Sequence, residues 1–233
     1  MTDGFELEAV SVRHDDVDVL LDVTVTIPDD GITVVAGPSG SGKSSLLRLL
    51  NRLDDPTAGN VRWRGSDIGS LDPRELRRRV AMVFQRPVMF TGTVLDNLRT
   101  VAPDLDCAAA VERLESVAFD PALLQRDADR LSGGEAQRLC LARALTTAPD
   151  VVLADEPTAS LDTDAQAHLE DLAQTMSRSV GWVWVTHDAD QIERLADHVV
   201  IVDEGQVTAS GTFDELTAHP DPRVRHVVLG ERS

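Results

Sequence analysis

Tyrosine is absent from the 233 residues, aromatic residues make up 3% of them, and there are two cysteines, Cys107 and Cys140. The cysteines lack the spacing of metal ligands, so we expect reduced thiols in a cytoplasmic protein. No apolar run approaches the roughly 20 residues that span a bilayer. The opening MTDGFELEA is acidic and polar, and we expect no signal peptide. The 42% hydrophobic share is that of a globular protein.

Lysine is almost missing as well. Arginine supplies every one of the 22 basic residues except Lys43, and 40 acidic residues bring the formal net charge to −18. Such a charge repels itself, and molar salt relieves this because the Debye length falls to about 3 Å. The composition resembles cytoplasmic proteins of halophiles, and we favour that origin over an acidic mesophile. An acidic surface also argues against nucleic-acid binding and against direct anchoring on anionic lipid.

Apolar periodicity predicts the organisation of the chain. Strands are expected in FELEAVSV, LLDVTVTI, ITVVAG, VRWRG, VAMVF, VVLA, WVWVT and the hairpin VVIVDEGQVTASG. Helices are expected in SSLLRLLNRL, after Asp72-Pro73, over 93–124 with breaks at Pro103 and Pro121, over 135–147 and over 213–218. Alternating strands and helices predict an α/β fold with a parallel core sheet, to which the early strands add an antiparallel β layer.

We therefore expect one domain. Its core with the β layer would comprise about 1–85 and 146–218, an inserted α-helical subdomain about 86–145, and a C-terminal tail 219–233.

A glycine-rich loop is expected between the strand ITVVAG and the following helix. Its residues fit G-x-x-x-x-G-K-[ST] at every fixed position, and they are Gly37, Pro38, Ser39, Gly40, Ser41, Gly42, Lys43 and Ser44. Backbone N–H groups of such a loop surround a phosphate, and the helix dipole adds positive potential. Lys43 would reach the β- and γ-phosphates, and Ser44 would ligate Mg²⁺. With Ser45 these residues form the expected nucleotide site of a P-loop NTPase.

An acid pair follows the buried strand VVLA. Asp155 and Glu156 would lie at the carboxyl edge of the sheet, where doubly wound folds bind their ligands. Asp155 would then face the Mg²⁺ held by Ser44, and Glu156 would orient or deprotonate a water beside the γ-phosphate.

The stretch LSGGEAQR resembles the signature of the ATP-binding cassette (ABC) ATPases, and with the other motifs the resemblance extends from about residue 5 to 218. The resemblance implies that two copies pair head to tail, each closing its signature over the ATP of the other. Small residues at a helix N-terminus suit an anion. The signature residues are Leu131, Ser132, Gly133, Gly134 and Glu135.

Further positions are implied by the same resemblance. Gln85 corresponds to the Q-loop glutamine, which contacts Mg²⁺ or the water. Ser160, Leu161 and Asp162 correspond to the D-loop at the dimer interface, and His187 to the switch histidine. Relatives carry an aromatic residue before the P-loop to stack on adenine; here His14 is the best-placed residue.

EPTASLD resembles import-type cassettes, and QRPVMFTGTVLDNL resembles phosphate- and tungstate-type importers as well as a group linked to metal export. These resemblances imply an ATP-hydrolysing subunit at the cytoplasmic face of the membrane. Its partners would be transmembrane permease subunits, with a solute-binding protein as a further partner. Val88, Met89 and Phe90 would contact the permease or form subdomain core. The alternatives are a metal-export ATPase and a soluble cluster-assembly ATPase.

Overall fold

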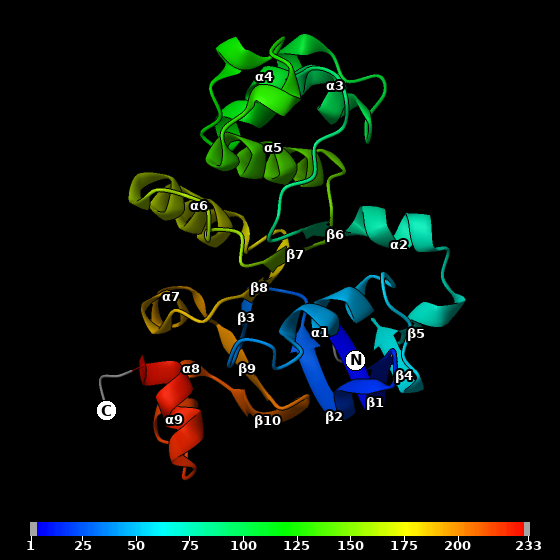
Figure 1. Cartoon of the computed structure of the whole chain (residues 1–233), viewed down its shortest axis with the longest axis vertical. Helices are drawn as coiled ribbons and strands as arrows, with labels where there is room; N and C mark the ends of the chain where they lie inside the picture. The colour runs from blue at the N-terminus through cyan, green and yellow to red at the C-terminus, as the bar shows by residue number, and fades with distance from the viewer. Residues whose placement is uncertain (1–3, 231–233) are drawn as a thin grey trace.

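The computed structural model describes residues 4–230, and in this range the chain forms two sheets with helices packed against them (Figure 1). The larger sheet has the strand order β10-β9-β3-β8-β7-β6, and every pair is parallel except β10 with β9. Its strands are β3 (Ile32–Ala36), β6 (Val80–Val83), β7 (Val151–Asp155), β8 (Gly181–Val185), β9 (His198–Asp203) and β10 (Gln206–Gly211). The predicted parallel α/β core is confirmed.

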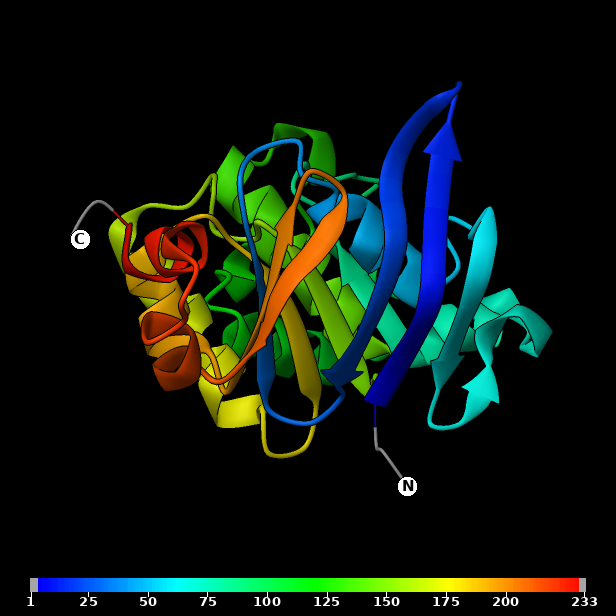
Figure 2. The same ribbon diagram turned by 90° about the horizontal axis from the view of Figure 1, so that it is seen from below.

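The smaller sheet is antiparallel and has the order β2-β1-β4-β5. Its strands are β1 (Gly4–His14), β2 (Val17–Pro28), β4 (Ala58–Trp63) and β5 (Ser66–Asp67). Figure 2 shows β1 and β2 running beside the β9–β10 hairpin, where Leu21 N donates to Gly205 O at 2.8 Å. This sheet is the antiparallel layer that the alternating N-terminal sequence predicts.

The parallel strands are buried on both faces, which explains their unbroken apolar sequences. In β8 the side chains alternate between two hydrophobic clusters. Trp182 and Trp184 belong to the cluster that includes residues of α5 to α9, whereas Val183 and Val185 belong to the cluster under the smaller sheet. The second cluster also contains the leucines of α1, so this helix is packed between the two sheets.

The helices are α1 (Lys43–Leu50), α2 (Pro73–Arg79), α3 (Val94–Arg99), α4 (Cys107–Ser116), α5 (Gly133–Thr146), α6 (Thr163–Met176), α7 (Ala189–Leu195), α8 (Phe213–Thr217) and α9 (Pro222–Leu229), with 3₁₀ turns η1 (Ile68–Ser70), η2 (Pro121–Leu123) and η3 (Ala128–Arg130). The predicted helix start at Asp72 is confirmed, because its side chain accepts from Arg74 N and Glu75 N. Helices α3 and α4 lie beyond α5, at the top of Figure 1.

Two segments differ from the prediction. Helix α5 begins at Gly133 rather than Glu135, because Ser132 caps it. Residues 219–233 were expected to form a tail, but α9 occupies most of this segment and buries Val224 and Val228 against the core. Asp221 caps α9 and Pro222 stands at its first position, a start signal that the prediction overlooked. None of the helices in residues 4–230 is long and apolar enough to cross a bilayer.

Candidate nucleotide site

The P-loop connects the end of β3 to the start of α1, and two of its glycines have backbone conformations that exclude a side chain. Gly37 has φ 144°, and a Cβ there would lie 1.9 Å from Val202 O. Gly42 has φ 106°, and a Cβ there would lie 2.8 Å from Val19 O. Gly42 also caps α1 without any side-chain hydrogen bond, which leaves the first N–H groups of the helix available to an anion.

Lys43 is buried and folds back over its own loop. Its Nζ donates to Gly37 O at 2.9 Å and to Pro38 O at 2.6 Å. Burial lowers the pKa of Lys43, and the charges of Glu156 and Asp155 oppose that shift. The ammonium group therefore lies near both acids, at the place where the motif requires a cation for phosphate.

A pocket of about 350 Å³ opens at this loop. Its lining residues are Val19, Ser39, Gly40, Gly42, Lys43, Ser44, Ser45, Gln85 and Glu156. Gly37, Pro38 and Ser41 do not line it: the carbonyls of Gly37 and Pro38 accept from Lys43, and Ser41 O accepts from Gly205 N at 3.0 Å. The P-loop, Gln85 and Glu156 thus share one cavity, although they are far apart in the sequence.

Asp155 ends β7 beside the first turn of α1. Ser44 Oγ donates to Asp155 Oδ1 at 3.0 Å. Burial raises the pKa of Asp155, reinforced by the charge of Glu156 and opposed by the Ser44 hydrogen bond and by Lys43. A hydroxyl beside a single carboxylate suits Mg²⁺, which binds few protein ligands and completes its shell with phosphate and water. Residues 4–230 contain no cluster of three His, Cys, Asp or Glu that could hold a metal ion.

Glu156 lies between Gln85 and His187. Gln85 Nε2 donates to Glu156 Oε2 at 2.7 Å, and His187 Nδ1 lies 3.6 Å from Glu156 Oε1. The sheet order explains the meeting, because β6, β7 and β8 are neighbours and these residues follow their carboxyl ends. Glu156 itself has φ 43°, a left-handed conformation that turns the chain sharply away from β7. Three positions predicted separately are therefore in contact.

His14 is not brought to the pocket. It ends β1, and its Nε2 lies 3.7 Å from Asp54 Oδ2. Val19 lines the pocket instead, and no signal in the sequence distinguishes it from other apolar residues of β2. The described residues place no aromatic side chain on the pocket lining.

The signature residues lie at the N-terminus of α5. Ser132 Oγ accepts from Glu135 N at 3.3 Å, and Glu135 Oε2 accepts from Ser132 N at 2.7 Å, which forms a capping box. The backbone hydrogen bond from Ser132 lowers the pKa of Glu135. A Cβ on Gly133 would meet nothing within 4 Å, so this position faces open space. Leu131 packs partly buried against the core.

The D-loop touches the signature. A Cβ on Gly134 would lie 3.5 Å from Leu161 Cδ2 and 3.7 Å from Ser160 O. Asp162 caps α6 by accepting from Ala165 N at 2.9 Å. Gln137, which the prediction left without a role, donates to Phe84 O at 3.1 Å and so links the signature helix to the residue before Gln85.

Comparison with known proteins agrees with this geometry. The family model described as ABC transporter matches residues 20–159. The chain is 42% identical over 215 residues to Protein STAR1 of Oryza sativa subsp. japonica, covering 89% of this chain and 62% of that protein. It is 35% identical over 247 residues to the Phosphate import ATP-binding protein PstB of Thermotoga maritima, covering 96% of both. The chain thus spans less than two thirds of the rice protein and nearly all of the Thermotoga protein.

Two further matches extend the comparison. The Sulfate/thiosulfate import ATP-binding protein CysA of Yersinia pestis is 36% identical over 241 residues, with 98% of this chain and 66% of that protein covered. A bacterial Atm1-family ABC exporter with ATP bound superposes with a TM-score of 0.88 at 23% identity, over 99% of this chain and 42% of that chain, and shares the fold. Because the family model matches more than half of the chain and a relative matches nearly its full length, this chain belongs to the ABC transporter family and is an ATPase.

Proposed function

We propose that this chain is the ATP-hydrolysing subunit of an importer that takes up a small solute such as an inorganic anion. Two relatives with import in their names, for phosphate and for sulfate or thiosulfate, support the direction and the class of solute. Within the pair of subunits that the family uses, ATP binding closes the dimer and hydrolysis opens it. This motion would drive separate permease subunits between two states.

Each residue of the site has its own role in the binding or hydrolysis of ATP. Lys43 exchanges its loop carbonyls for the β- and γ-phosphates of ATP, and the N–H groups of the P-loop surround them. Ser44 and Asp155 would hold Mg²⁺, which would supply charge neutralisation on the phosphates. Glu156 takes a proton from the attacking water, while Gln85 and His187 hold that carboxylate and the water in place. We still propose that His14 stacks on adenine, which requires its ring to move away from Asp54.

A second copy of the chain completes each site. The open space at Gly133, in the first turn of α5, suits the γ-phosphate of the partner's ATP. Contact between Gly134 and the D-loop would carry the closure of one copy to the other.

The observation that carries the transport role is the segment after Gln85. Val88 is 53% exposed and Phe90 is 48% exposed, although both are large and apolar. Asn97, on α3, accepts from Phe90 N and donates to Phe90 O, both at 2.9 Å, while Arg143 donates to Val88 O at 2.9 Å and lies over the Phe90 ring. The exposed apolar side chains of Val88 and Phe90 are thus held by these contacts, a few residues after Gln85, which touches Glu156. This arrangement suits contact with a permease.

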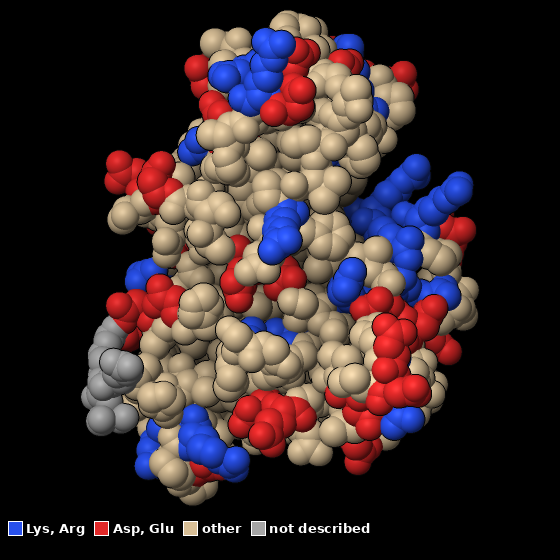
Figure 3. All heavy atoms as spheres, in the orientation of Figure 1, with Lys and Arg blue, Asp and Glu red and all other residues tan. Residues whose placement is uncertain are grey.

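The proposed location is the cytoplasmic face of the membrane, through the permease and without direct docking on anionic lipid. Figure 3 shows acidic side chains gathered over the region of the smaller sheet, whereas basic ones gather over α2. An acidic surface is repelled by nucleic acid and by anionic lipid. A solute-binding protein would act outside the cell in the same system. Metal export remains the alternative direction, and a soluble cluster-assembly ATPase is the alternative without a permease.

A pull-down tests the transport role. Tagged Glu156→Gln protein is incubated with detergent-solubilised host membranes in molar KCl with ATP and Mg²⁺, and its partners are identified by mass spectrometry. We expect an integral membrane protein at near one-to-one stoichiometry, whose identity narrows the solute. Val88→Ser combined with Phe90→Ser should lose this partner, whereas Val17→Ser, which changes a valine that is 63% exposed on β2, should retain it. Recovery of soluble partners alone would favour the cluster-assembly role.

A further inference from the structure

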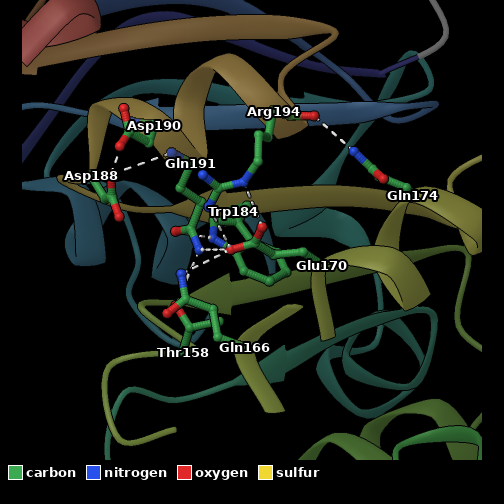
Figure 4. Close-up of polar contacts among 9 residues, drawn as sticks. All are labelled: Thr158, Gln166, Glu170, Gln174, Trp184, Asp188, Asp190, Gln191 and Arg194. Carbon is green, nitrogen blue, oxygen red and sulfur yellow. Dashed lines mark hydrogen bonds and ion pairs between the residues drawn. The ribbon is translucent and has the colours of Figure 1, made fainter. Parts of the chain in front are cut away.

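A buried glutamine connects the segments that follow β7 and β8. Gln191 lies in the first turn of α7 and is 1% exposed. Its Oε1 accepts from Trp184 Nε1 at 3.0 Å, and its Nε2 donates to Glu170 Oε1 at 2.7 Å and to Thr158 Oγ1 at 3.2 Å (Figure 4). These partners come from β8, from α6 and from the loop after Glu156. A single side chain therefore joins three elements.

Glu170 fixes the orientation of this glutamine. It comes from α6, is 6% exposed, and also accepts from Gln166 at 3.0 Å and from Arg194 at 3.0 and 3.1 Å. Burial alone would raise the pKa of Glu170, but the hydrogen bonds from Arg194, Gln191 and Gln166 lower it. The indole N–H is a donor and the carboxylate is an acceptor, so only one orientation of the Gln191 amide satisfies both. The amide is thus locked.

The locked amide lies between the two segments that carry Glu156 and His187. Thr158 stands two residues after Glu156, and Trp184 stands three residues before His187. Gln191 itself follows His187 by four residues, and its backbone N–H donates to Asp188, the cap of α7. Displacement of Gln191 would move both segments relative to each other, and with them the 3.6 Å separation of His187 from Glu156.

We propose that Gln191 is a positioning residue, which sets the spacing of His187 and Glu156 through its hydrogen bonds to Thr158 and Trp184. The inference rests on the proposed roles of Glu156 and His187 in hydrolysis. It assigns Gln191 no contact with ATP, since Gln191 does not line the nucleotide pocket. Its loss should therefore slow the chemical step and leave ATP binding unchanged.

The test compares the same substitution at two residues that share one acceptor. Gln191→Met removes the bridge, whereas Gln166→Met removes another donor to Glu170 Oε1 and leaves the bridge intact. Rates are normalised to ATP-binding stoichiometry, so that unfolded protein is not counted. For Gln191→Met we expect kcat to fall about tenfold or more with KM for ATP unchanged, because small misplacements of catalytic groups cost up to about 100-fold. Gln166→Met should keep kcat; equal kcat in both variants overturns the proposal.

A milder variant guards against loss of folding. Thr158→Val keeps the shape of the side chain and removes the acceptor for Gln191. It should lower kcat in the same direction, and the double variant Thr158→Val, Gln191→Met should be no slower than Gln191→Met alone. If the losses of kcat in the two single variants add up in the double variant, the two residues do not act through their shared hydrogen bond, and the proposal is contradicted. If Glu156→Gln hydrolyses ATP at the wild-type rate, the proposed role of Glu156 fails; if it does not and Gln191→Met has normal kcat, only the positioning role of Gln191 fails.

Discussion

Ser44 Oγ donates to Asp155 Oδ1 at 3.0 Å, which joins the first turn of α1 to the end of β7. Asp155 is buried, and this burial raises its pKa. A raised pKa means that the folded protein binds the proton more tightly than the unfolded chain does. Above that pKa the carboxylate therefore lowers stability, and the loss is relieved as the pH falls through it. The acid is retained at this position at the expense of stability, as expected of a Mg²⁺ ligand.

We predict that Asp155→Asn raises the melting temperature of the nucleotide-free protein at pH 7, and that this gain disappears as the pH falls through the raised pKa. The same variant should need more Mg²⁺ for ATP hydrolysis, by at least the roughly 10- to 100-fold that loss of an outer-shell partner of a metal ligand costs. Thermal scans across pH and a Mg²⁺ titration measure the two effects. Asp171→Asn, on the exposed face of α6, is the matched control. A lower melting temperature at pH 7 would contradict the argument.

The contacts of Glu156 with Gln85 and His187 lead to a second prediction. Glu156→Gln should bind ATP and form a dimer, and should hydrolyse about 100- to 10,000-fold more slowly, the range for loss of a general base. The amide keeps an oxygen that can accept from Gln85, so the pocket keeps its shape. Phosphate release and light scattering with ATP measure hydrolysis and dimerisation. Glu112→Gln, on an exposed position of α4, should hydrolyse ATP as the wild type does. Hydrolysis at the wild-type rate in Glu156→Gln would contradict the assignment of Glu156 as the base.

The capping box of α5 gives a third prediction. Glu135→Ala should lower the free energy of unfolding by about 1 kcal/mol, because Ser132 N loses its acceptor. Glu135→Gln should lose less, since its amide oxygen can still accept. The hydrogen bond lowers the pKa of Glu135 below its ordinary 4.5, so its stabilisation is present above that value and is lost as the pH falls through the lowered pKa. Urea titrations at pH 7 and at acid pH test this, and a gap between wild type and Glu135→Ala that does not narrow in acid would count against it.

The parts of the site that the sequence predicted are those with local chemistry. The P-loop was predicted from its own sequence pattern, although the backbone that a Cβ on Gly37 or Gly42 would strike belongs to Val202 and Val19, which are distant in sequence. The position of Glu156 followed from the rule that ligands bind at the carboxyl edge of a parallel sheet, whereas Gln85 was implied by the resemblance to the ABC ATPases. These inferences required no knowledge of distant contacts.

The other features of the site and fold were not predicted, because they depend on contacts between residues that are distant in sequence. The residues that flank Gln137 in the sequence do not indicate that it donates to Phe84 O. Those that flank Gln191 do not indicate that it accepts from Trp184 Nε1. His14 has the sequence position of a base-stacking residue, but the path of β1 leaves it beside Asp54. Helix α9 was not predicted, although Asp221 caps it and Pro222 stands at its first position.

The surface charge gives the last prediction. With a net charge of −18 and acidic groups gathered over the smaller sheet (Figure 3), the folded protein is destabilised by self-repulsion in dilute buffer. The midpoint of urea unfolding should therefore rise between about 0.1 M and 2 M KCl, as the Debye length falls from about 10 Å toward 3 Å. Screening alone saturates once this length is shorter than the spacing of the charges, so a continued rise in molar salt supports a halophilic origin. A midpoint that stays constant or falls would favour an acidic mesophile protein, whose exposed acids are tolerated at low salt.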